Sequence, residues 1–129
     1  MRAEIIATGS ELLTGGVPDT NSRFLAEELL DIGIEPAFKT VVGDNDKDME
    51  EALRCAFARV DVILVTGGIG PTEDDMTRKA VARVLKKRLV LSDDALKAVK
   101  AVFSTKGKEY PRANDRQALI PGGARLLIN

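Results

Sequence analysis

Histidine and tryptophan are absent from the 129-residue sequence, and cysteine occurs once, at Cys55. Without histidine, the chain has no Ser-His-Asp or Cys-His nucleophilic machinery and no histidine-ligated metal site. A single cysteine excludes an internal disulfide and a cysteine-based zinc cluster, and it fits a reducing cytoplasm. We interpret Cys55 as a core residue of a helix. Any metal is therefore expected to be a hard cation held by aspartate and glutamate oxygens, or one brought in by a phosphorylated ligand.

Basic stretches, aromatic residues and long apolar runs are also scarce. Lysine and arginine number 19 against 20 aspartates and glutamates, with only four phenylalanines and one tyrosine, so nucleic-acid binding has little electrostatic support. No apolar run approaches membrane-spanning length, and the first residues, MRAEIIATG, become polar too soon for a signal peptide. We expect a single domain over residues 1–129, located in the cytoplasm, with neither nucleic acid nor a membrane as a partner.

The stretch that organises the chain is VDVILVTGGIGPTEDDMT, residues 60–77. Its apolar run predicts a buried parallel strand, its glycines predict a turn, and the following residues predict a helix from Glu73 to about Lys86. Thr72 and Asp75 have the spacing of a capping box at the start of that helix. Glycines that allow positive φ, followed by a helix N-terminus, offer free amides to a phosphate or a carboxylate.

Three acidic residues accompany these glycines and bear on the kind of ligand. Glu73, Asp74 and Asp75 repel a phosphate unless a cation lies between, so the loop indicates a metal-bridged phosphate as much as a bare anion pocket. The alternative is a tight strand-to-helix turn whose glycines serve only local geometry. Three glycines and three consecutive acids exceed what such a turn needs, which favours the ligand site.

Two other predicted strands also end in polar loops. Residues 3–8 run into GSELLTGGVPDTN at 9–21, and residues 34–42 run into a glycine and acids at 43–46. The alternation of strands and helices predicts a three-layer α/β/α sandwich with a mostly parallel central sheet. Because the carboxyl ends of parallel strands meet at one edge, we treat these two loops and the loop at 66–75 as one site.

Amphipathic helices are expected between the strands, at residues 21–32, up to residue 59, at 73–86 and after Ser92. The expected N-caps are Thr20 for the first helix, Asp44 or Asp46 for the second and Ser92 for the last. For the acids at 43–46, capping and ligand contact stay equally open. The side chains expected to face inward are Phe24, Leu25, Leu29 and Ile32; Met49, Leu53, Ala56 and Phe57; Ala80, Val81, Val84 and Leu85; and Leu96, Val99, Val102 and Phe103.

Three further features concern the strands. Pro36 lies within the second predicted strand, and proline cannot donate to a ladder, so that strand is expected at a sheet edge. Residues 88–91 are expected to form a short strand. After a turn at 120–123, ARLLIN at 124–129 is expected to form a final strand.

Four motifs resemble those of a known family, and together they cover nearly the whole chain. They are GSELLTG with DTN at 9–15 and 19–21, VGDN at 42–45, TGGIGPTEDDMT at 66–77 and ANDRQALIPGGARLLIN at 113–129. The chain resembles the molybdopterin-binding domain of the MoaB/MogA cofactor-biosynthesis proteins and, more specifically, the N-terminal domain of the CinA competence/damage-inducible family. The resemblance implies the three-layer α/β fold of the molybdopterin-binding, MogA-like type.

The resemblance also implies an activity: a divalent-metal-dependent ADP-ribose pyrophosphatase, which is a hydrolase of nucleoside-diphosphate sugars that uses Mg²⁺, Mn²⁺ or Co²⁺. The two site aspartates of the family fall on Asp44 and Asp75, as catalytic and metal-binding residues, and Asp74 is a further metal candidate. The expected ligand-binding residues, several of them in the phosphate-cradling loop, are Ser10, Glu11, Asn21, Thr66, Gly67, Gly68, Gly70 and Thr77.

Other functions stay open at this point. The same loops suit binding of molybdopterin as a ligand and its adenylylation, or a non-catalytic nucleotide-binding module. In each case the partner is a small phosphorylated molecule. The resemblance implies homo-oligomers, trimers in the MoaB/MogA group and at least dimers among CinA proteins. Family members continue beyond residue 129 into a glycine-containing loop and a C-terminal amidohydrolase domain, so we expect the domain to be truncated here.

Overall fold

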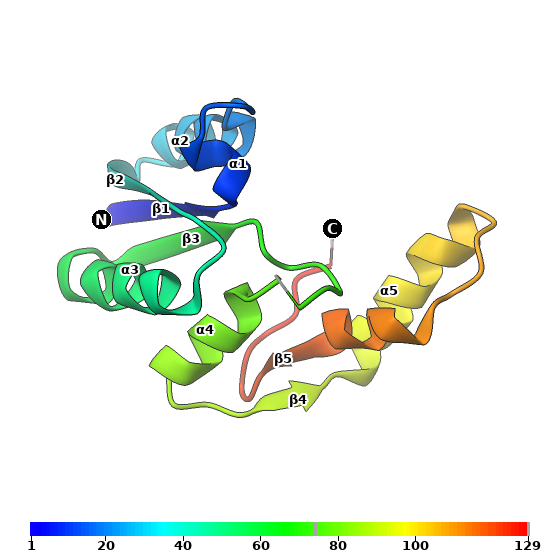
Figure 1. Ribbon diagram of the computed structural model, residues 1–129. Coiled ribbons are helices and arrows are strands. Elements are labelled where there is room, and N and C mark those ends of the chain that lie inside the picture. The colour runs from blue at the N-terminus through cyan, green and yellow to red at the C-terminus, as the bar shows by residue number, and fades with distance from the viewer. Residues whose placement is uncertain (74, 129) are drawn as a thin grey trace. The chain divides into compact units, whose positions relative to one another are not determined.

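The computed structural model describes residues 1–73 and 75–128, and the chain forms two compact units, Met1–Gly68 and Ile69–Asn129. The first contains β1 (Arg2–Thr8), α1 (Ser10–Leu13), α2 (Thr20–Asp31), β2 (Glu35–Val42), α3 (Asp46–Arg59) and β3 (Val62–Thr66) (Figure 1). The second contains α4 (Thr77–Val84), β4 (Leu89–Leu91), α5 (Asp93–Thr105), the 3₁₀ helix η1 (Arg112–Ala118) and β5 (Leu119–Pro121). No helix in the described part of the chain is long and apolar enough to span a bilayer.

The first unit is built on a three-stranded parallel sheet in the order β2-β1-β3, which confirms the predicted parallel sheet. The central strand β1 is buried from Ala3 to its end at Thr8. β2 is an edge strand, as the proline predicted. The register shifts by one residue there, because Ala3 pairs with Pro36 while Glu4 pairs with Phe38.

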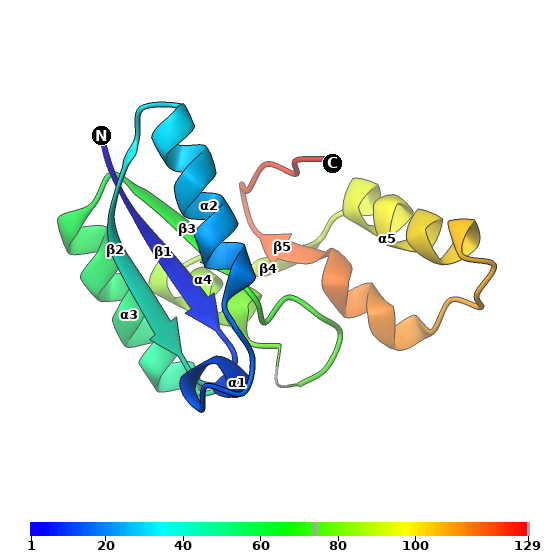
Figure 2. The ribbon, with the colours of Figure 1, turned by 90° about the horizontal axis from the view of Figure 1, so that it is seen from above.

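Helices cover both faces of this sheet, with α2 on one face and α3 on the other (Figures 1 and 2). On the α2 face, Ala3 and Ile5 of β1 form a buried cluster with Leu29 of α2. On the α3 face, Glu4 of β1 is bonded to Arg59 of α3. Neighbouring residues of β1 thus serve opposite faces, as the strand period requires. Within this unit the predicted three-layer arrangement is confirmed.

The second unit contains a short antiparallel ladder between β4 and β5, with Val90 opposite Ile120. The predicted strand at 88–91 is confirmed as β4. The strand predicted at 124–129 is wrong for its described part, since residues 124–128 pair with no strand, and Leu127 and Ile128 are exposed. The reason is that the preceding segment takes the ladder position, and a turn in which the Ala124 amide donates to the Pro121 carbonyl (2.9 Å) then ends it.

Two of the predicted N-caps are wrong by one residue. Asp19, not Thr20, caps α2 by accepting from the Ser22 amide (3.0 Å). Asn45 caps α3 by accepting from two amides, in place of Asp44 or Asp46. Neighbouring Asp, Asn and Thr residues have similar capping preferences, so backbone geometry decides among them. The prediction for Ser92 is confirmed, because it accepts from the Ala95 amide.

The helix after the glycine loop begins at Thr77, not at Glu73. The Thr72 and Asp75 side chains do interact, but in a turn before the helix. Several side chains predicted to face inward are exposed instead: Phe24, Ile32, Phe57, Leu85, Val102 and the single cysteine, Cys55. Leu29, Met49, Leu53, Ala56 and Ala80 are buried as predicted. In the first unit, the three-stranded sheet covers only a narrow stripe of α2 and α3, so Phe24, Ile32 and Phe57 at the edge of the predicted faces stay in water.

Candidate functional site

The strands of the first unit end at the same edge of the sheet, where the loops after β1 and β2 are bonded to each other. The Ser10 amide donates to Asp44 Oδ2 (3.2 Å), and the Asp44 amide donates to Ser10 Oγ (3.1 Å). The Gly9 amide also donates to the Val42 carbonyl (3.0 Å). The predicted meeting of the loops at 9–21 and 43–46 is therefore confirmed, and Asp44 is placed at this edge with its carboxylate exposed to solvent.

The start of the glycine loop joins this edge from β3. Asn21, in the first turn of α2, donates from Nδ2 to the Thr66 hydroxyl (3.3 Å). Gly67 and Gly68 have φ values of 92° and 60°, in the region that favours glycine. A Cβ atom on Gly67 lies 2.3 Å from the Thr8 carbonyl oxygen, so no other residue fits there without moving the end of β1.

A cavity of about 200 Å³ lies at this edge, within the first unit. Its wall brings together residues of the β1 end, the loop after it, the start of α2 and the β3 end: Thr8, Glu11, Leu12, Val17, Pro18, Asp19, Thr20, Asn21, Thr66 and Gly67. We call this cavity the strand-end pocket. The Thr8 hydroxyl is buried and has no hydrogen-bond partner in the described part of the chain. An unsatisfied buried hydroxyl costs free energy, so it is a feature that a bound polar group can relieve.

Asp19, the less exposed of the two acids on the wall of the strand-end pocket, already has a cationic partner. Asp19 accepts from the Ser22 amide, and its Oδ2 lies 3.1 Å from Lys39 Nζ. Burial raises the pKa of Asp19, but the hydrogen bonds from Ser22 and Lys39 and the lysine charge outweigh it, so the pKa lies below its ordinary value. Its negative charge is therefore balanced by Lys39 and does not by itself repel an anion in the pocket. Glu11 is exposed on the wall.

The rest of the glycine loop belongs to the second unit, where two charged side chains hold it. Asp75 Oδ2 accepts from the Thr72 amide (2.9 Å) and the Thr72 hydroxyl (2.6 Å). The Arg78 guanidinium donates to the carbonyls of Ile69 and Gly70, the latter at 2.8 Å. The Thr72 hydroxyl lowers the pKa of Asp75, burial raises it, and the Thr72 and Gly70 amides with the Arg78 charge lower it further. Asp75 is therefore ionised at neutral pH.

Two more of the expected ligand-binding residues, Gly70 and Thr77, lie in this unit. A Cβ on Gly70 lies 2.5 Å from Asp75 Oδ2, so the absence of a side chain gives the carboxylate its place. Thr77 is the first residue of α4 and is buried. Asp74, predicted as a metal ligand, lies outside the described residues.

The predicted metal site has carboxylates of the right kind but no assembled cluster. Over residues 1–73 and 75–128, no three acidic or cysteine side chains come together in a way that could hold an ion. Asp44 and Asp75 offer the carboxylate oxygens that hard divalent cations prefer. Their assignment as metal ligands stays a prediction.

Residues with no signal in the sequence also contribute. Thr8 is only the last residue of an apolar strand, and Lys39 is one of many exposed lysines. Arg78 lies nine and eight residues after the two carbonyls to which it donates. None of them lies in a glycine or acidic motif. Only the three-dimensional arrangement identifies them.

Comparison with known proteins shows the family of the chain. A family model described as "Probable molybdopterin binding domain" matches residues 4–123. The structure of the protein CinA from Thermoplasma acidophilum, whose function is given as unknown, matches with a TM-score of 0.84 and 30% identity, over 96% of this chain and 72% of that one. The chain belongs to the CinA family of molybdopterin-binding domains. The predicted resemblance is therefore confirmed.

Curated CinA relatives are longer than this chain. The competence-damage inducible protein of Geobacillus sp. (strain WCH70) is 46% identical over 129 residues, which is 100% of this chain and 31% of that protein. The corresponding protein of Alkaliphilus metalliredigens (strain QYMF) is 44% identical with the same coverage. The chain thus spans about a third of the length of the curated relatives it matches.

A more distant likeness shows the fold. The molybdopterin biosynthesis enzyme MoaB from Thermus thermophilus matches the CinA-family chain with a TM-score of 0.64 and 23% identity, over 93% of this chain and 78% of that one. The predicted MoaB/MogA-like fold is confirmed by this match.

Proposed function

We propose that this CinA-family domain binds a nucleoside-diphosphate sugar and hydrolyses its pyrophosphate bond, with ADP-ribose as the substrate that the family resemblance implies. The observation that carries the proposal is the strand-end pocket. It combines an amide and a hydroxyl, those of Asn21 and Thr66, with glycine backbone at Gly67 that no larger residue can replace. Close approach to backbone amides is what a phosphate needs, and neutral polar donors suit a ribose or a base edge.

The chemistry is cleavage of a phosphorus–oxygen bond by water. One phosphorus gains the oxygen of water, the bridging oxygen leaves with the other phosphate, and ADP-ribose gives AMP and ribose 5-phosphate. A divalent cation, when bound, supplies positive charge to the pyrophosphate and makes water a better nucleophile. Asp44 in the first unit and Asp75 in the second are each a candidate to hold it, with Asp74 and Glu11 as further candidates. Because the chain has no histidine, a carboxylate is its only side chain suited to accept the proton near neutral pH.

Turnover of ADP-ribose tests this proposal. The wild-type chain is expected to release AMP with Mg²⁺, Mn²⁺ or Co²⁺ and to stop when EDTA is added. Asp44→Asn and Asp75→Asn each keep the shape of the side chain but remove its charge, so each is expected to lower kcat/KM by about 10²-fold or more. Asp31→Asn, an exposed acid at the end of α2, is the matched control and is expected to keep full activity.

Two results would count against the hydrolase. The first is AMP release that EDTA leaves unchanged. The second is full activity in both site variants while circular dichroism shows the native fold. Variants that bind ADP-ribose as the wild type does but lose turnover support a role in the reaction step itself.

A second candidate function is binding of molybdopterin with transfer of AMP to it. The description of the matching family favours this candidate, as does the name of the Thermus thermophilus structure. Its ligand also combines a phosphate with a heterocycle, which suits the same pocket. Formation of adenylylated molybdopterin from ATP, without release of AMP from ADP-ribose, distinguishes it from the hydrolase. Tight binding without any product instead indicates a non-catalytic module.

A further inference from the structure

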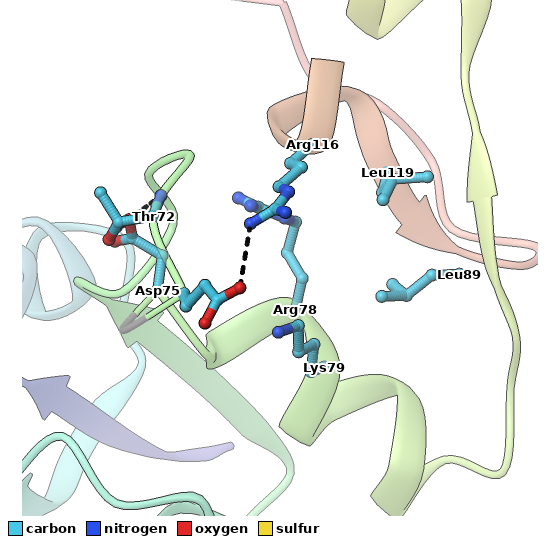
Figure 3. A pocket seen from close by; sticks show the side chains of 8 residues that line it. Thr72, Asp75, Arg78, Lys79, Leu89, Arg116 and Leu119 are labelled. Atoms are coloured by element: carbon cyan, nitrogen blue, oxygen red, sulfur yellow. Dashed lines mark hydrogen bonds and ion pairs between the residues drawn. The ribbon is translucent and has the colours of Figure 1, made fainter. Parts of the chain in front are cut away.

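A second cavity, of about 280 Å³, lies within the second unit and is lined by charged side chains (Figure 3). Arg78 and Lys79 come from α4, and Arg116 comes from η1. Glu73 and Asp75 are the described acids on its wall. Among the described lining residues, three cations thus outnumber two anions, and the cations come from two separate elements.

The charges of Arg78 and Asp75 are already engaged. Arg78 donates to the carbonyls of Ile69 and Gly70, and burial lowers its pKa while the neighbouring Asp75 raises it. Asp75 accepts from the amide and hydroxyl of Thr72. These two side chains fix the loop that forms one wall. The other two lining cations, Lys79 and Arg116, are therefore the ones that a ligand can engage.

Arg116 and Lys79 are those remaining cations. Arg116 Nη1 lies 3.9 Å from Glu73 Oε1, and the two side chains are 54% and 86% exposed. A surface pair at that distance contributes little and is easily exchanged for a better anion. Lys79 forms no ion pair with any of residues 1–73 or 75–128. Two cations therefore line the cavity. The ion pair of Arg116 is weak, and Lys79 has no ion-pair partner among the described residues.

Besides the charged residues and Thr72, the described lining is apolar. Leu89 of β4 and Leu119 of β5 contribute it, one from each strand of the antiparallel ladder. The cavity volume lies near the lower end of the range for ligand pockets, about 300–1,000 Å³, so it suits a small anionic group with a compact attachment. Arginine binds such an oxyanion through two parallel bonds, and lysine adds a point charge.

We propose that this cavity binds a phosphate or pyrophosphate group, with Arg116 as the bidentate ligand, Lys79 as the second cation, and Glu73 as the competing anion that the ligand displaces. The inference rests on the proposed function in one respect, since Asp75, a candidate catalytic residue, lines the same cavity.

Binding of inorganic pyrophosphate in the presence of EDTA tests the proposal without any need for turnover. Isothermal titration calorimetry at fixed salt is expected to give saturable binding in the wild-type chain. Arg116→Gln is expected to weaken it about tenfold or more, because it removes two charge-assisted bonds. Glu73→Gln is expected to tighten it about two- to fivefold, because the competing anion is gone. Malonate, a carboxylate anion, is expected to bind more weakly than pyrophosphate.

Arg125→Gln is the matched control, since Arg125 is exposed and does not line the cavity. It is expected to change the affinity by less than about twofold. The proposal is overturned if the folded wild-type chain binds no pyrophosphate at about 10 mM. It is also overturned if Arg116→Gln and Arg125→Gln weaken binding equally, if Glu73→Gln weakens it, or if malonate binds as well as pyrophosphate.

The failure of this inference and that of the proposed function can be told apart. Pyrophosphate binding that depends on Arg116, without hydrolysis of ADP-ribose, contradicts the proposed hydrolase function and supports the anion site. Hydrolysis of ADP-ribose by a chain that binds no pyrophosphate, or whose pyrophosphate binding does not depend on Arg116, contradicts only the anion site.

Discussion

Replacing Arg59 by methionine is expected to lower the free energy of unfolding by about 3–5 kcal/mol, because it leaves a buried carboxylate without its cation. Glu4 is fully buried in β1. Arg59 binds it through two bonds, from Nε to Oε2 (2.8 Å) and from Nη2 to Oε1 (2.7 Å). The Thr40 hydroxyl donates to Oε1 as well (2.6 Å). In the Arg59→Met variant, that single neutral donor remains.

Glu4→Gln is the matched variant from the other side of the pair, and its cost is expected to be smaller, about 1–3 kcal/mol. The Arg59 side chain is 39% exposed and its guanidinium lies 3.9 Å from the centre of the Phe38 ring, so it keeps access to water and an aromatic partner. Urea denaturation with unchanged m-values measures both effects. Equal losses in the two variants would show that burial of the carboxylate does not determine the cost.

The same pair predicts a dependence on pH. Burial raises the pKa of Glu4, but hydrogen bonds from Arg59 and Thr40 and the arginine charge outweigh it, so the folded-state pKa lies below the ordinary 4.5. The unfolded carboxyl group then takes up a proton at a higher pH than the folded one. The stabilisation is therefore complete above pH 4.5 and is lost as the pH falls through the folded-state pKa.

In Arg59→Met the direction of the pKa shift of Glu4 reverses. Without the arginine, burial raises the pKa of Glu4, and protonation relieves the unpaired charge. The difference in stability between wild type and variant is therefore expected to shrink as the pH falls from about 7 to about 3. A difference that stays constant over that range would contradict the assignment of the cost to Glu4.

Replacing Gly67 by alanine is expected to lower both the stability of the fold and the affinity for ADP-ribose. The φ of 92° strains any residue with a side chain by about 1–3 kcal/mol, and the new Cβ collides with the Thr8 carbonyl at 2.3 Å. The expected loss of unfolding free energy is about 3–5 kcal/mol, with ADP-ribose binding at least about tenfold weaker because the loop must move.

Gly33→Ala carries the backbone strain of a positive φ without a collision, so comparison with Gly67→Ala gives the cost of the collision. Gly33 follows the C-cap of α2 with a φ of 75°, and nothing lies within 4 Å of the position of its Cβ. This variant is expected to lose only about 1 kcal/mol and to leave ligand binding unchanged. Similar losses in the two variants, measured by urea denaturation, would mean that the contact with Thr8 is relieved at no cost.

The elements that could be predicted from the sequence were those whose local residue pattern agrees with their surroundings in the folded chain. Apolar runs with β-branched residues gave the three parallel strands, and Pro36 correctly marked the edge strand. The meeting of Ser10 and Asp44 followed from the topology, because parallel strands end at one edge. The position of the strand-end pocket could therefore be predicted before its residues were placed.

Other features depend on contacts that a local pattern does not contain. Thr72 and Asp75 match the letters of a capping box, yet they close a turn before the start of α4 at Thr77. Phe24 and Phe57 lie at the edge of apolar faces that the narrow sheet leaves uncovered. The ion pair between Glu4 and Arg59 joins residues 55 positions apart, and no periodicity indicates it.

The most direct test of the central claim, that the strand-end pocket takes a phosphorylated nucleotide, is an amide NMR titration of the ¹⁵N-labelled chain with ADP-ribose in EDTA. Saturable shifts are expected at the Gly67 and Gly68 amides and at the Asn21 side-chain amide, and they are expected to be lost in Gly67→Ala. Saturable binding whose shifts are confined to residues outside this pocket, or no shift at about 10 mM ligand, would contradict it.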